Sequence, residues 1–115
     1  MSNRKELKIH YLNLLERFSD EKFIDDVWVN GRYYDYVFSF DELVEMFEDF
    51  FFFDEMKSFL VEIEDPDQKS IIEKFLDRIE GYSTPSNPSE LLSDKKFIEI
   101  KKLAHDVEEI IKKYY

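Results

Sequence analysis

Apolar residues recur along most of this chain at intervals of three and four, the spacing that places them on one face of a helix. The first such run follows Asn3 and Glu6, which together form a capping box. Its apolar positions are Leu7, Tyr11, Leu14, Leu15 and Phe18. The pattern therefore predicts a first helix over about Arg4–Phe18.

The next segment, residues 19–38, can be interpreted in two ways. Ser19 can cap a short second helix that ends at Asn30-Gly31, and Asp20 and Glu21 suit the positive end of such a helix. The run VWV-NG-RYY is also the pattern of a β-hairpin near residues 26–38. We favour the helix, followed by an extended or irregular connection over residues 32–38, and keep the hairpin as the alternative.

A second capping box, Ser39 with Glu42, opens the most aromatic part of the chain, which contains MFEDFFFFDEM. Its apolar spacing fits one long helix from Phe40 to Glu64. It fits equally two helices that meet near Phe53-Asp54, because Asp54 can cap a new start. The sequence leaves both arrangements open.

Four successive phenylalanines cover all sides of a helical turn, and a helix that is apolar all round is normally buried. We therefore expect this segment to be the central helix, with Phe50 and Phe51 in the core. Phe52 or Phe53 would cover a neighbouring helix or lie partly exposed as a docking residue. The side left in contact with water would carry Asp41, Glu45, Glu48 and Asp49.

Two further helices are predicted in the second half of the chain. Asp65 as a cap, Pro66 at the first helical position and Gln68 closing the box start a helix that ends at Gly81. A loop rich in proline and serine follows, and Ser93 opens a last helix that runs almost to residue 115. The whole chain, 1–115, is thus expected to be a single all-α domain, a compact bundle of five to six helices.

Charge is concentrated in one third of the chain. The formal net charge is −11, and residues 31–65 alone contain 2 basic and 11 acidic groups, a net charge of −9. Such a field repels nucleic acid and anionic membranes and attracts cations or basic proteins. The simpler interpretation is that the acidity only keeps an aromatic-rich protein in solution.

The sequence lacks the residues that several kinds of catalytic and metal sites require. The chain has no Cys, no glycine-rich phosphate loop, and no Glu three positions before His10 or His105 as a di-iron bundle requires. We therefore expect no enzyme, no metal and no cofactor. The basic residues after position 65 are balanced by acidic ones, so no nucleic-acid partner is expected. With no signal peptide and no apolar run of about 20 residues, we expect a cytoplasmic protein without a membrane segment.

Protein recognition is the class that remains. Tyrosine is a favoured hot-spot residue, and carboxylates around such anchors would speed association with a basic protein. The alternative is that the tyrosines only fill gaps at the edge of the bundle. The candidate partner-binding residues are Tyr33, Tyr34, Asp35, Tyr36, Asp41, Glu45, Glu48 and Asp49.

Three stretches have the character of small acidic helical proteins: FSDEKFIDDVW, FSFDELVEMFEDFF and DKKFIEIKKLAHDVEEIIKKYY. In these the chain resembles bacterial immunity proteins, which bind and block a cognate toxin. The resemblance implies stoichiometric binding to a basic partner, often a toxin nuclease, without catalysis by the chain itself. The alternatives are a DNA mimic that inhibits a nucleic-acid-binding protein, and a structural homodimer formed through exposed phenylalanines. The oligomeric state is left open.

Overall fold

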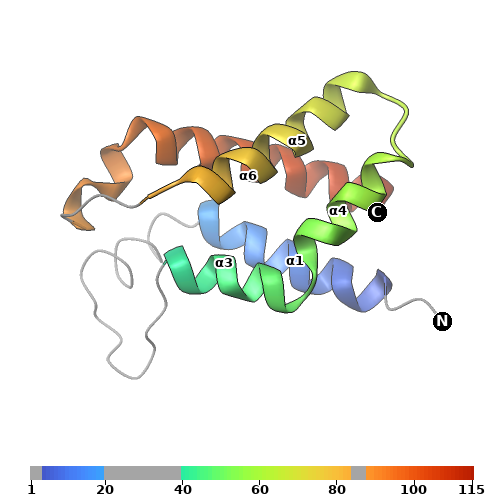
Figure 1. Cartoon of the computed structure of the whole chain (residues 1–115), viewed down its shortest axis with the longest axis horizontal. Coiled ribbons are helices and arrows are strands. Elements are labelled where there is room, and N and C mark those ends of the chain that lie inside the picture. Colours follow the sequence, from blue (N-terminus) through green and yellow to red (C-terminus); the bar gives the residue numbers. More distant parts are fainter. Residues whose placement is uncertain (1–3, 20–39, 84–87) are drawn as a thin grey trace.

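A computed structural model describes residues 4–19, 40–83 and 88–115, and most of these residues lie in helices (Figure 1). The elements are α1 (Arg4–Ser19), α3 (Phe40–Asp49), α4 (Phe52–Leu60), α5 (Pro66–Gly81), the 3₁₀ helix η2 (Pro88–Ser93) and α6 (Lys95–Tyr114). The described residues contain no strand, so the all-α prediction is confirmed for them. The predicted second helix, the alternative hairpin near residues 26–38 and the connection 32–38 lie outside the described residues.

The starts of α5 and α6 are set by side chains that accept hydrogen bonds from free backbone N–H groups. The Asp65 carboxylate accepts a hydrogen bond from the Asp67 N–H at 2.8 Å, with Pro66 at the first helical position, and α5 ends at Gly81 as predicted. Helix α6 is capped in the same way by Asp94, which accepts from the Lys96 N–H at 2.9 Å. The prediction that Ser93 opens this helix is therefore wrong by one residue.

Helix α6, and not the segment 40–64, is the element around which the others pack. It lies against α1, α5 and η2, whereas α3 contacts α1 and α4, and α4 contacts α5 (Figure 1). The expectation of a central acidic helix is wrong, because α3 is buried on one face only. None of the described helices is long and apolar enough to cross a membrane.

The core is a cluster of aromatic rings contributed by different helices. Phe18 of α1 meets Phe75 of α5 edge-on, with ring centres 5.9 Å apart. Phe47 of α3 and Phe52 of α4 are 4.5 Å apart, and Phe52 also meets Phe75 edge-on at 6.1 Å. Such pairs add roughly 0.5–1.5 kcal/mol each beyond the area they bury. The abundance of phenylalanine therefore serves mainly to hold α1, α3, α4 and α5 together.

Candidate functional site: the α3–α4 corner

The acidic aromatic stretch is divided between two helices by one residue in an unusual conformation. Phe51 has φ 59° and ψ 30°, in the left-handed region, and it is the only non-glycine residue with positive φ among those described. The Phe51 N–H still donates to the Glu48 carbonyl at 3.0 Å, and the Phe51 carbonyl accepts the first bond of α4 from the Glu55 N–H at 2.9 Å. Two helices thus meet at Phe50–Phe51, not near Phe53-Asp54.

This turn decides which phenylalanine reaches water. Phe52 is fully buried, Phe50 and Phe53 are half-buried, and Phe51 exposes 67% of its surface. The prediction that Phe51 lies in the core is therefore wrong, whereas Phe50 packs against the core. Of the two alternatives for Phe52, contact with a neighbouring helix is the one observed, and Phe53 is partly buried. The prediction assumes a continuous helix through Phe51. Because the backbone is left-handed there, residues after Phe51 do not lie on the helix faces that a continuous helix would give them.

Helix α1 holds the turn in place. The buried Tyr11 hydroxyl donates a 2.6 Å hydrogen bond to the Phe50 carbonyl, which satisfies one of the carbonyls released where α3 ends. Burial raises the pKa of Tyr11 above its ordinary value. The His10 ring stacks on the Phe50 ring with centres 4.2 Å apart. Helix α1 therefore anchors Phe50, the residue directly before the left-handed Phe51.

Three carboxylates of α3 whose side chains are described lie on the side opposite its core residues. Leu43 and Phe47 are buried, whereas Glu45, Glu48 and Asp49 are exposed, and no ion pair joins these three to any described residue. The last turn of α3 contains no basic residue. The structure therefore brings together three of the predicted carboxylates, as expected for one wet side.

The remaining predicted site residues are not described in the same detail. The backbone of Asp41 lies in α3, but its side chain is outside the described set. Tyr33, Tyr34, Asp35 and Tyr36 lie outside the described residues altogether. The sequence predicts Phe51 in the core. The one feature that points to an exposed phenylalanine is that four adjacent phenylalanines cannot all face one core. We call Glu45, Glu48, Asp49 and Phe51 the acidic corner.

Other carboxylates of the acidic segment are engaged within the fold. Arg4 of α1 forms a two-pronged ion pair with Glu62, in which Nη1 lies 3.0 Å from Oε1, and this bond lowers the pKa of the Glu62 carboxyl. Glu55 accepts a 2.8 Å hydrogen bond from the Tyr115 hydroxyl. Burial and this carboxylate raise the pKa of Tyr115 to about 12. Glu55 and Glu62 thus have partners within the fold, whereas Glu45, Glu48 and Asp49 form no ion pair with a described residue.

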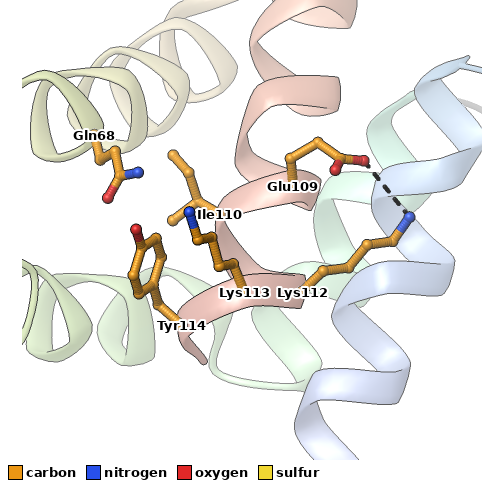
Figure 2. A pocket seen from close by; sticks show the side chains of 6 residues that line it. All are labelled: Gln68, Glu109, Ile110, Lys112, Lys113 and Tyr114. Atoms are coloured by element: carbon orange, nitrogen blue, oxygen red, sulfur yellow. Dashed lines mark ion pairs between the residues drawn. The ribbon is translucent and has the colours of Figure 1, made fainter.

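The two hollows beside Tyr114 are shallow and mixed in character. One, of about 280 Å³, is lined by Gln68, Glu109, Ile110, Lys112, Lys113 and Tyr114 (Figure 2). Figure 2 shows the Tyr114 hydroxyl directed toward the Gln68 amide, and Gln68 and Lys113 lower the pKa of that phenol. The other, of about 350 Å³, lies between Glu62 and Tyr114.

Among the described residues, no group of three or more His, Cys, Asp or Glu side chains could hold a metal ion. Comparison with known proteins identifies no relative: no family model matches the chain, and no curated protein or solved structure matches it.

Proposed function

We propose that this chain is a non-catalytic acidic binding protein of the immunity or inhibitor type, which docks its acidic corner on a basic site of a partner such as a toxin nuclease. The observation that carries the proposal is that two locally unfavourable choices coincide there. Local rules are most often broken at functional sites, where stability is exchanged for another property.

The first unfavourable choice is charge at the end of α3. The C-terminus of a helix carries partial negative charge, and an acidic side chain there costs roughly 0.3–1 kcal/mol. Glu48 and Asp49 occupy this last turn without a basic neighbour in it. Glu45 also lies four residues before Asp49, a like-charge spacing that costs about 0.2–0.5 kcal/mol. Lysine at any of these positions would suit the isolated helix better.

The second unfavourable choice is the residue at the turn. The left-handed region costs a bulky L-residue roughly 1–2 kcal/mol, and glycine would occupy it without that cost. Phe51 instead accepts the strain while leaving most of its ring in water. An exposed aromatic residue beside unpaired carboxylates is the composition expected of an anchor in a protein interface.

Association kinetics test the proposal. A candidate basic nuclease would be bound to the full chain across a salt series from about 50 to about 500 mM. We expect the association rate to fall steeply with salt, because unpaired surface charge steers the encounter. In the triple variant Glu45→Gln, Glu48→Gln, Asp49→Asn, the rate should be low and nearly independent of salt.

A matched control removes the same charge elsewhere. Glu73, Glu80 and Glu90 are exposed acids of α5 and η2, and their triple replacement by Gln should leave most of the rate intact. Equal losses in the two variants, or an association rate indifferent to salt, would overturn the proposal. Displacement of the chain from a nucleic-acid-binding protein by unrelated DNA would instead favour the DNA mimic. A dimer in light scattering would favour the homodimer.

A further inference from the structure

We infer that Phe51 is the platform for an arginine side chain of the basic partner, with the guanidinium stacked on the ring and hydrogen-bonded to the corner carboxylates. This inference rests on the proposed function and names the chemistry at the centre of its interface. The occupant is a basic segment of another protein that presents arginine at this position.

The placement of the ring argues against a role in folding. Phe51 exposes 67% of its surface, whereas the Phe50 ring stacks on His10 of α1 and the Phe52 ring meets Phe75 of α5. Phe51 itself takes part in no ring pair among the described residues. A side chain that contributes so little packing in a costly backbone conformation is best explained by a contact outside the chain.

The surroundings of the ring select a cation over an apolar partner. Carboxylates flank Phe51 along the chain: Glu48 and Asp49 precede it, Asp54 follows it in the first turn of α4, and all three are exposed. An apolar surface pressed onto Phe51 would remove water from these carboxylates without replacing it by a donor. A guanidinium covers the ring with its flat face and donates hydrogen bonds to carboxylates from its edge.

The same combination already occurs inside the molecule. The Arg4 guanidinium carbon lies 4.4 Å from the centre of the Tyr115 ring and 5.8 Å from that of Phe59. Its nitrogens meanwhile form the two-pronged pair with Glu62. There the cation is supplied by α1. At the acidic corner the aromatic ring and the carboxylates are present, and we assign the cation to the partner.

Arginine fits this site better than lysine. Lysine carries a compact and strongly hydrated charge, which can approach a carboxylate but gains little by lying flat on a ring. At an exposed site a cation–π contact is worth about two- to five-fold in affinity, which corresponds to roughly 0.5–1 kcal/mol. The preference for arginine is therefore measurable and separate from the general attraction of positive charge.

The experiment uses two synthetic peptides of equal length and net charge, one with arginine and the other with lysine as its basic residue. Each is titrated into the ¹⁵N-labelled full chain at about 50 mM salt, where exposed charges are weakly screened. We expect the arginine peptide to bind about two- to five-fold more tightly. The largest amide shifts should fall on residues 48–55.

Variants at position 51 separate the effect of the aromatic π face from that of the apolar size of the side chain. Phe51→Leu keeps an apolar side chain without a π face, so the two peptides should bind it equally. Phe51→Tyr keeps the face and should keep the preference. Ile98→Ala, which shortens another exposed apolar residue on α6, is the control and should change neither affinity.

The outcomes distinguish this inference from the proposed function. Salt-sensitive binding of both peptides with equal affinity, unchanged in Phe51→Leu, would overturn the arginine platform and leave acidic docking in place. Peptide shifts located away from residues 48–55 would also overturn it, and the nuclease experiment would then decide the function separately. Self-association of the chain that is abolished in Phe51→Leu would make the occupant a second copy and overturn the inference.

Discussion

Phe51 and Phe52 are adjacent residues with opposite environments, and single substitutions should show it. Phe51→Gly removes the strain of a left-handed phenylalanine, which stabilises the folded chain by roughly 1–2 kcal/mol. Glycine also raises the conformational entropy of the unfolded chain, which cancels part of this gain. We expect the free energy of unfolding to rise by about 0.5–1 kcal/mol in urea titrations. A clear loss of stability would mean that the Phe51 ring packs against the bundle.

The neighbouring substitution is the matched control. Phe52 is fully buried and its ring meets those of Tyr11, Phe47 and Phe75. Phe52→Ala should therefore lower the free energy of unfolding by roughly 3–5 kcal/mol, because it opens a cavity in the aromatic core. Similar effects at positions 51 and 52 would contradict the assignment of one ring to the core and the other to the surface.

Buried tyrosines should make the fold sensitive to alkali. Tyr115 has a pKa of about 12 in the folded chain against an ordinary value of 10.0, so between these pH values the unfolded chain binds fewer protons. Its contribution to the free energy of unfolding is complete below about pH 10 and declines as the pH rises toward 12. The pKa values of Tyr11 and Tyr82 are also raised, which adds to the slope.

Urea titrations at several pH values between about 8 and 11 test this dependence. Tyr115→Phe should flatten the alkaline decline, and at neutral pH it should cost about 0.5–1.5 kcal/mol for the lost bond to Glu55. Tyr114→Phe serves as the control, because Tyr114 is exposed and its pKa is lowered, so this variant should not flatten the decline. An unchanged slope in Tyr115→Phe would show that other groups cause the effect.

At the scale of single elements, the start of α5 depends on one carboxylate. Asp65→Ala leaves the Asp67 N–H without its acceptor and should lower the free energy of unfolding by about 1 kcal/mol. Asp65→Asn retains an acceptor oxygen and should lose only a few tenths of that amount. Chemical unfolding of the two variants checks this, and equal losses would indicate that charge, and not the cap, matters there.

Such elements were predictable because their signals are local. The Asp65-Pro66 start, the Gly81 end and the first helix all follow from caps and from a period that spans a few turns. The division between α3 and α4 was not predictable in position, since Phe51 carries no sequence signal for a left-handed residue. Asn or Gly at this position would have indicated a left-handed residue, whereas a phenylalanine indicates a continuing helix or strand.

At the scale of the whole molecule, long-range contacts decide which acids remain free. Arg4 and Glu62 are 58 positions apart, and Tyr115 and Glu55 are 60 apart, so no local pattern could pair them. Their contacts tie α1 to the residues just after α4, and the residue that follows α6 to α4 itself. The sequence predicted a concentrated anionic segment, and the fold removes Glu55 and Glu62 from it by giving them partners. Among the described residues, the carboxylates of the acidic corner remain exposed without an ion pair, as do those of Asp54 and Glu64.

The acidic corner should therefore lower stability while it serves binding. Replacing Glu45, Glu48 and Asp49 by their amides changes the net charge from −11 to −8, because three carboxylates are lost. We expect the free energy of unfolding to rise by roughly 0.5–1 kcal/mol as like charges and the unfavourable helix end are relieved. A net charge of this size still favours solubility.

If the corner acids only kept the chain in solution, any three exposed carboxylates would be equivalent. Replacement of Glu73, Glu80 and Glu90 by Gln makes the same change in net charge away from the corner. We expect this control to gain less stability in urea titrations and to retain association with the basic partner, which the corner variant loses. A corner variant that is less stable than the parent would mean that these carboxylates hold the fold. An equal rise in the free energy of unfolding in the control would mean that the lower net charge alone causes the stabilisation.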